Sequence, residues 1–222
     1  ASAPCSNSPN AEDPWMASRE LMVVQQLQAR GISDPRVLAA MRKVPRHELI
    51  PEGNRADAYG DHPVPIGEGQ TISQPLIVAY MTECLELTGS EKVLEVGTGS
   101  GYQAAILGEL AREVYSIEIV PSLAKRAAED LKRLGYTNIH VREGDGYRGW
   151  PEEAPFDGII ITAAPPQVPQ PLLDQLKIGG RLVAPIGVDV QQLVRITRTA
   201  TGFSEEKLVP VRFVPMTGEA QN

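Results

Sequence analysis

From residue 92 onward, short runs rich in β-branched residues alternate with stretches of helical composition. Such alternation is typical of a mostly parallel sheet with helices on both of its faces. We therefore predict an α/β fold with a doubly wound, mostly parallel sheet over residues 76–222, with helices after Tyr102, over 121–134 and near 170–176. The strand-like runs are KVLEV (92–96), EVYSIE (113–118), NIHVRE (138–143), FDGIIIT (156–162) and GRLVAPI (180–186).

Two further strand-like runs, 191–199 and 206–214, follow with no helix between them. Strands joined by so short a connection pair in antiparallel fashion, so we predict a C-terminal antiparallel hairpin at the edge of the sheet.

The residues before this core indicate a layer of helices and loops. Apolar residues near helical spacing predict a helix over 15–30 that Gly31 ends, and the segment SDP predicts the cap and first turn of a second helix over 35–43. Residues 45–69 are rich in Pro, Gly and charge but carry apolar residues throughout, which favours an ordered, packed segment. A third helix is predicted from 75 to about 87.

The length, composition and charge of the chain limit the number of domains and the kinds of partner that we expect. With 222 residues, 42% of them hydrophobic, we expect a single domain over 15–222 after a disordered or extended tail at 1–14. No apolar run is long enough for a membrane span, so no membrane partner is expected. A net charge of −7 without a block of Lys and Arg disfavours nucleic acid, and a monomer is the favoured state.

The two cysteines lie far apart in different surroundings. Cys5 is in the polar tail and Cys84 in an apolar helical stretch, which favours a tail thiol and a buried core thiol over a disulfide. This usage fits a reducing compartment, and we expect a cytoplasmic protein, although the tail leaves a processed or exported form open.

The run VLEVGTGSGY joins a buried strand, a glycine turn and a helix start. Glycines allow a sharp turn and close approach to a ligand, and the helix start carries positive partial charge. The spacing of Gly97, Gly99 and Gly101 is G-x-G-x-G, which differs from the dinucleotide fingerprint, from the phosphate-binding P-loop and from the nucleophile elbow. By itself, such a loop is also compatible with a plain tight turn.

Acidic residues near this loop sharpen the interpretation. Glu118 ends the second strand, 21 residues after Gly97, where a carboxylate can accept hydrogen bonds from both ribose hydroxyls. Asp145 follows the third strand and could accept from an adenine amino group, and Glu95 suits the amino acid end of a ligand. An adenosine held by acids rather than by Arg or Lys suggests S-adenosylmethionine, whose sulfonium is cationic. The cofactor-binding candidates are Glu95, Gly97, Thr98, Gly99, Ser100, Gly101, Glu118, Asp145 and Gly146.

The histidines predict no metal site and no catalytic triad. His47, His62 and His140 are too scattered for a paired-ligand motif, so a structural or surface role is expected for each.

The sequence resembles the bacterial protein-L-isoaspartate (D-aspartate) O-methyltransferases over about residues 16–217. The segment TISQP, combined with GTGSGYQAA and the stretch from GDG to PFD, carries the most specific part of the match. The resemblance implies a Rossmann-like class I methyltransferase, with residues 15–75 forming the substrate-side layer and 76–222 the cofactor-binding core.

The resemblance also implies a reaction. A methyl group would pass from S-adenosylmethionine to the free α-carboxylate of an L-isoaspartyl residue in a damaged protein or peptide, leaving S-adenosyl-L-homocysteine. The methyl ester would then collapse to a succinimide and so begin repair. Carried over to TISQP, Ser73 would be the catalytic residue that donates a hydrogen bond to the acceptor carboxylate, and Thr71 and Ile72 would shape the same wall. The expected peptide groove comprises Pro65, Ile66, Gly67 and Val214, with Pro215 and Met216 beside the last.

Two alternatives stay open at this stage. The first is an S-adenosylmethionine-dependent methyltransferase with a different small-molecule or protein acceptor. The second is a non-catalytic protein that binds S-adenosylmethionine and keeps the same fold. A Ser73→Ala variant that binds cofactor but transfers no methyl group would separate them from the favoured function.

Overall fold

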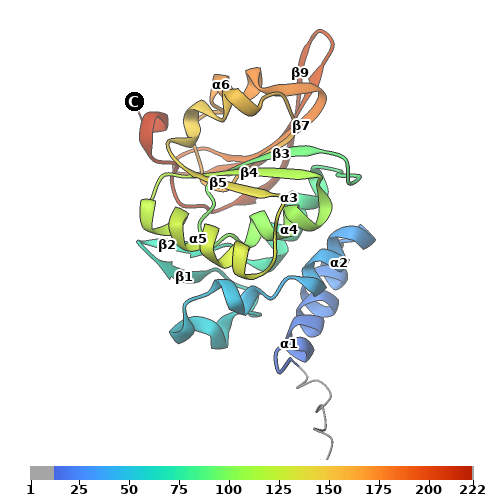
Figure 1. The fold of residues 1–222 in the computed structure, drawn as a ribbon. Helices are drawn as coiled ribbons and strands as arrows, with labels where there is room; N and C mark the ends of the chain where they lie inside the picture. Colours follow the sequence, from blue (N-terminus) through green and yellow to red (C-terminus); the bar gives the residue numbers. More distant parts are fainter. Residues whose placement is uncertain (1–12, 222) are drawn as a thin grey trace, which may run out of the picture.

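The computed structural model describes residues 13–221, and a seven-stranded sheet runs through its centre in the order β5-β4-β3-β6-β7-β8-β9 (Figure 1). The strands from β5 to β7 are parallel, and β8 and β9 continue the sheet in antiparallel fashion. The predicted α/β sheet and the C-terminal hairpin are therefore confirmed. The strands are β3 (Lys92–Val96), β4 (Glu113–Glu118), β5 (Ile139–Glu143), β6 (Phe156–Ile161), β7 (Leu176–Ile186), β8 (Gln191–Thr199) and β9 (Gly202–Val211).

Helices cover both faces of the sheet. α4 (Tyr102–Leu110) and α5 (Pro121–Arg133) connect β3 to β4 and β4 to β5 on one face, where α3 (Pro75–Cys84) also packs. The short α6 (Gln170–Asp174) lies on the other face (Figure 1). Buried residues of each strand alternate between two apolar cores, one on each face, as expected for parallel strands covered on both sides.

Three elements have boundaries that differ from the prediction by three residues or more. β9 covers Gly202–Val211 rather than residues 206–214. α3 ends at Cys84 rather than near residue 87, because Glu86 has a φ of +51°, which is incompatible with a continuing helix. β7 begins at Leu176 rather than at residue 180, because Leu176 already pairs with Phe156 before an irregularity in the ladder.

The N-terminal layer packs against α3 and α4. One helical segment runs through α1 (Met16–Leu21), a π-helical turn (Met22–Leu27) and a 3-10 turn (Gln28–Arg30), and it ends at Gly31 with a φ of +99°. α2 (Pro35–Lys43) begins as predicted, since the Asp34 carboxylate accepts hydrogen bonds from the first-turn amides.

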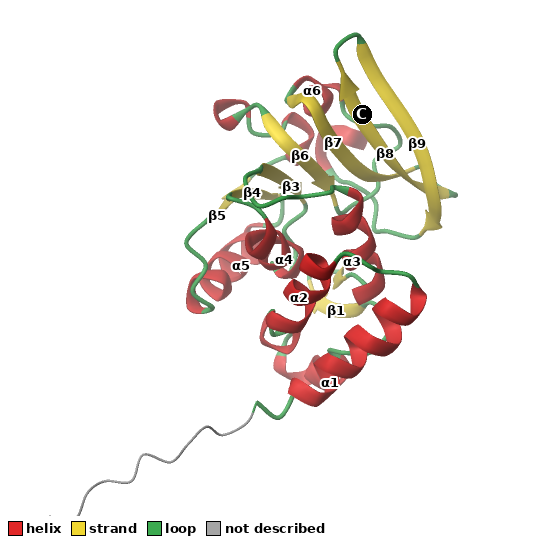
Figure 2. Cartoon of the chain, turned by 90° about the vertical axis from the view of Figure 1, so that its right-hand side faces the viewer, coloured by secondary structure: helices red, strands yellow, loops and turns green. Residues whose placement is uncertain are grey.

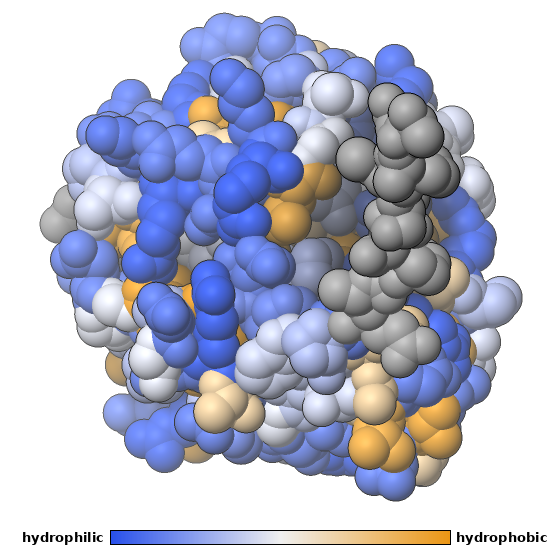
Figure 3. Space-filling view, turned by 60° about the horizontal axis from the view of Figure 1, so that its bottom comes forward, coloured by the Kyte–Doolittle hydropathy of each residue, from blue (hydrophilic) through white to orange (hydrophobic). Residues whose placement is uncertain are grey.

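Residues 45–69 are ordered, as predicted, but they contain a hairpin that the sequence did not indicate. Two 3-10 turns (Arg46–Leu49 and Glu52–Asp57) lead into β1 (Val64–Gly67), which pairs in antiparallel fashion with β2 (Gln70–Ile72). This small sheet lies among the N-terminal helices and apart from the central sheet (Figure 2). Seen from below, the molecule is mostly hydrophilic, with apolar residues in small separate patches (Figure 3).

Some predictions for the ends of the chain concern residues outside the described range. The predicted tail lies there except for Asp13 and Pro14, and so does Cys5. Cys84 is a buried thiol in α3, as predicted. Within residues 13–221, no helix combines the length and apolar character needed to cross a membrane.

Candidate active site

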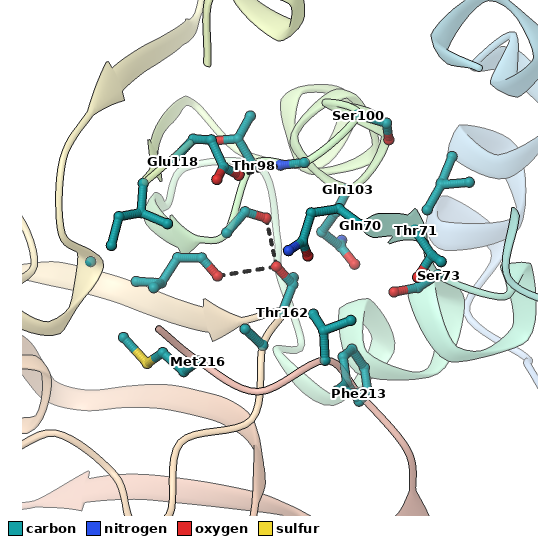
Figure 4. Close-up of a pocket in the computed structure, with 18 of the residues that line it drawn as sticks. Gln70, Thr71, Ser73, Thr98, Ser100, Gln103, Glu118, Thr162, Phe213 and Met216 are labelled. Carbon is teal, nitrogen blue, oxygen red and sulfur yellow. Dashed lines mark hydrogen bonds between the residues drawn. The ribbon is translucent and has the colours of Figure 1, made fainter. Parts of the chain in front are cut away.

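A cleft opens at the carboxyl ends of β3, β4 and β6, where the order of the central strands reverses (Figure 4). Open parallel sheets bind their ligands at this kind of position. The space between its walls, including the part that opens to solvent, is about 920 Å³. Its lining comprises residues 70–73, 77, 78, 81, 96–100, 102, 103, 117–120, 146, 162, 163 and 213–217.

The glycine loop after β3 forms the floor of the cleft. The Gly97 amide donates to the Ile117 carbonyl of β4 at 2.8 Å, which ties the loop to the neighbouring strand. The Thr162 hydroxyl at the end of β6 donates to the Gly97 carbonyl at 2.5 Å. Gly97 has a φ of +99°, and a Cβ there would lie 2.4 Å from the Thr162 Oγ1 atom, so only glycine fits.

Glu118 lies at the end of β4 with its carboxylate at the cleft wall. Its Oε2 atom accepts from the Gly99 amide at 2.7 Å, and its Oε1 atom accepts from the Val120 amide at 2.9 Å. The first bond ties the carboxylate to the glycine loop and the second ties it to the start of α5. Figure 4 shows the Glu118 side chain beside Thr98. A carboxylate has about four lone-pair directions, so it keeps acceptor capacity for hydroxyl groups of a ligand.

Glu95 does not line the cleft but lies beneath the glycine loop. Thr98, which does line it, has its hydroxyl 2.5 Å from that of Ser116, and Ser116 donates to the Glu95 Oε2 atom at 2.5 Å. Glu95 is 0% exposed, and its Oε1 atom has no partner among the described residues. Burial, followed by the nearby Glu118 charge, raises the pKa of Glu95 to about 8, because a buried ionised carboxylate is poorly solvated.

Other cofactor candidates differ in their placement. Gly99 and Ser100 line the cleft, and so does Gly146, whereas Gly101 faces α5. The Asp145 carboxylate is turned away from the cleft, because it accepts from the amides of Tyr147 and of Glu219 in the C-terminal turn.

The TISQP segment forms the opposite wall. Thr71, Ile72 and Ser73 line the cleft between β2 and α3, and the Ser73 hydroxyl points into the cavity (Figure 4). Gln74, not Ser73, is the N-cap residue of α3. Within residues 13–221 the Ser73 hydroxyl has no hydrogen-bond partner, so it remains available for a ligand.

The expected groove residues fall in two places. Val214 lines the cleft on a segment that Ala164 holds by two backbone hydrogen bonds of 2.8 Å, one to the Val214 carbonyl and one from the Met216 amide. Pro65 and Gly67 lie outside the cleft lining and are exposed, whereas Ile66 is buried beneath the glycine loop.

Several lining residues were missed at the sequence level. Thr162 directly follows a buried strand, so the strand-end reasoning that found Glu118 could have found it. Gln103 is a polar residue in an otherwise apolar helix, and its side-chain amide donates to the Thr82 hydroxyl at 2.8 Å. Gln70 and Phe213 carry no local signal, because their place in the cleft depends on how distant segments pack.

The charge of the cleft limits its chemistry. Among the described residues that line it, Glu118 is the one carboxylate, and Lys, Arg and His are absent. The predicted structural or surface histidines lie elsewhere: His47 stacks on Trp15, His62 is exposed, and His140 contacts Glu113. Such a cleft suits a cationic ligand with ribose hydroxyls, and it offers no strong base.

The sheet order, the glycine loop and the strand-end carboxylate define a Rossmann-like methyltransferase. The family model for protein-L-isoaspartate(D-aspartate) O-methyltransferase matches residues 18–221. The chain therefore belongs to the protein-L-isoaspartate O-methyltransferase family, as its sequence motifs indicated.

Named relatives agree with this family. A protein-L-isoaspartate O-methyltransferase of Picosynechococcus is 56% identical over 208 residues, covering 94% of both chains. Protein-L-isoaspartate O-methyltransferase 2 of Shewanella sediminis is 58% identical over 210 residues, covering 94% of this chain and 86% of its own.

Solved structures agree as well. A protein-L-isoaspartate O-methyltransferase superposes with a TM-score of 0.82 at 28% identity, covering 91% of this chain and 67% of its own. A Plasmodium falciparum structure in complex with S-adenosyl-L-homocysteine has a TM-score of 0.79 at 28% identity, covering 90% of this chain and 98% of its own.

Proposed function

We propose that this protein methylates the free α-carboxylate of L-isoaspartyl residues in damaged proteins and peptides, using S-adenosylmethionine. One observation carries the proposal. The glycine loop with Glu118 and the unengaged Ser73 hydroxyl open into the same cleft from opposite walls. A cofactor on one wall and an acceptor on the other would thus meet inside a single cavity.

The cofactor half is built from the central strands. Glu118 would accept from the ribose hydroxyls, and Thr98, Ser100, Gly97 and Gly99 would contact the remainder of the cofactor. Gly146 also lines the cleft on this side, and Asp145 would accept from the adenine amino group after release of the Glu219 amide. Glu95 acts on the amino acid end indirectly, by holding the loop through Ser116 and Thr98.

The acceptor half is formed by the N-terminal layer and the C-terminal segment. Ser73 donates a hydrogen bond to the acceptor carboxylate, while Thr71, Ile72 and Val214 shape the wall around it. Pro65 and Gly67 are exposed, so a peptide longer than the acceptor residue can reach their backbone, and Ile66 supports them from below.

The proposed methyl transfer requires side chains to orient the reactants but not to act as an acid or a base. When bound, S-adenosylmethionine supplies an electrophilic methyl group and becomes the neutral thioether S-adenosyl-L-homocysteine. An acceptor carboxylate is already ionised at neutral pH, so Ser73 need only orient it and no side chain has to remove a proton. The absence of Lys and Arg from the described lining avoids an ion pair that would compete for the acceptor carboxylate.

The proposal also includes the oligomeric state, the location and the partners of the protein. It acts as a monomer in the cytoplasm, with isoaspartyl proteins and peptides as its partners and without nucleic acid or membrane. The acidic net charge of −7 supports the first of these exclusions.

A Ser73→Ala variant tests the proposal. Loss of one hydrogen bond to a charged group is expected to lower kcat/KM for an isoaspartyl peptide about tenfold to hundredfold. Affinity for S-adenosyl-L-homocysteine, measured by calorimetry, is expected to stay within about twofold, since the Ser73 side chain lies on the opposite wall. The exposed Ser204→Ala variant serves as the matched control. Unchanged turnover in Ser73→Ala would remove Ser73 from the reaction.

A further inference from the structure

The turn between β7 and β8 carries two valines that protrude into solvent. Val188 is 72% exposed and Val190 is 82% exposed. β-Branched apolar side chains gain free energy when they leave water, so a pair of them at one turn marks a contact surface that is open in the free protein. We call Val188 and Val190 the valine lip.

The backbone of this turn directs both side chains outward. Gly187 has a φ of +125°, and a Cβ at that position would lie 2.1 Å from the Val190 carbonyl oxygen. The backbone of the turn is therefore closed tightly on itself, and the two valine side chains are exposed outside it.

The valine lip is continuous with the rim of the cleft. On one side the Gly187 amide donates to the Pro165 carbonyl at 3.1 Å, two residues from Ala163, which lines the cleft. On the other side Gln191 follows Val190 directly. Its side-chain amide donates to the Phe213 carbonyl at 3.0 Å and accepts from the Phe213 amide at 2.6 Å, and Phe213 also lines the cleft (Figure 4).

We propose that the valine lip binds an apolar side chain flanking the acceptor residue in an extended polypeptide. The inference rests on the proposed function. An isoaspartyl acceptor is part of a polypeptide, so the chain must leave the cleft on both sides of the methylated carboxylate. Extended residues advance about 3.3 Å each, so side chains a few positions from the acceptor lie beyond the rim of the cleft, on which the lip stands.

The test compares isoaspartyl nonapeptides that carry either Leu or Ser three residues before or three residues after the acceptor. Wild-type protein is expected to show a KM about fivefold lower for a Leu peptide than for its Ser counterpart, on one side of the acceptor. In a V188S/V190S double variant this difference should disappear. KM for the Ser peptides and affinity for S-adenosyl-L-homocysteine should remain unchanged.

Ile178→Ser provides the matched control. Ile178 is 62% exposed on the same strand β7, but it lies near the start of the strand, at the end away from the rim. This variant should keep the preference for Leu.

Three outcomes would overturn the proposal that the valine lip binds a side chain flanking the acceptor. The first is equal KM for Leu and Ser peptides in the wild type, and the second is a preference that survives in V188S/V190S. The third is a wild-type dimer in sedimentation that V188S/V190S converts to a monomer without altering the preference, since a second copy would then cover the lip. Wild-type protein that methylates no isoaspartyl peptide would contradict the proposed function itself.

Discussion

Replacing Glu95 with glutamine should change how the stability of this protein depends on pH. Glu95 is 0% exposed, accepts one hydrogen bond from Ser116 on Oε2, and has no partner for Oε1 among the described residues. Its pKa is raised from 4.5 to about 8, so the folded state holds a proton there that the unfolded state has released. A glutamine amide matches this protonated carboxyl in shape and keeps an oxygen that accepts from Ser116, with its uncharged NH2 group in the place of Oε1.

Proton linkage gives the sign and the size of the pH dependence of the free energy of unfolding. The folded-state pKa is raised, so this contribution is complete below about pH 4.5 and is lost as pH rises toward 8. Each pH unit in that window removes up to about 1.4 kcal/mol, or about 4 kcal/mol between pH 5 and pH 8. Glu95→Gln has no such proton to lose. The free energy of unfolding of the variant, minus that of the wild type, should therefore rise by about 4 kcal/mol over this range.

Urea unfolding followed by tryptophan fluorescence at pH 5, 6, 7 and 8 measures this difference. Glu205→Gln, a change at an exposed position of β9, should give a profile parallel to the wild type. If Glu95→Gln also ran parallel to the wild type, Glu95 would not hold the extra proton in the folded state, and the reasoning from its burial would be refuted.

Two further substitutions probe the cofactor half of the cleft. Glu118→Ala should raise the Kd for S-adenosyl-L-homocysteine about tenfold to hundredfold in calorimetry, because ribose hydroxyls lose their acceptor, and a Kd equal to wild type would contradict this role. Thr162→Val removes the donor to the Gly97 carbonyl and should weaken the same binding about threefold to tenfold, with Thr162→Ser restoring it. Equal affinities for Thr162→Val and Thr162→Ser would show that this hydrogen bond does not position the loop.

Local pattern was sufficient to predict the central sheet. The inner parallel strands β3 and β6 are buried on both faces, so a run such as 156–162 is mostly apolar and is bounded by polar or glycine-containing turns. The hairpin of β1 and β2 was missed because its strands have only four and three residues, and Pro65 interrupts the pattern.

Some residues of the site could be predicted from the local sequence, whereas others depend on contacts between distant segments. The glycine loop and Glu118 follow directly from strand ends, where any parallel sheet presents its ligand-binding edge. The orientation of Asp145 was not predictable, since it depends on the Glu219 amide 74 residues further along the chain. Phe213 likewise lines the cleft only because the Gln191 side chain holds its backbone.

The most direct measurement uses two synthetic peptides that differ only in Asp versus isoAsp at one position. Each is incubated with the protein and radiolabelled S-adenosylmethionine, and base-labile methyl ester is counted. We expect label on the isoAsp peptide alone, because Ser73 and its wall orient a carboxylate that a normal aspartyl backbone does not present. Label on neither peptide, with S-adenosyl-L-homocysteine still bound in calorimetry, would contradict the proposed acceptor while leaving the family and the fold in place.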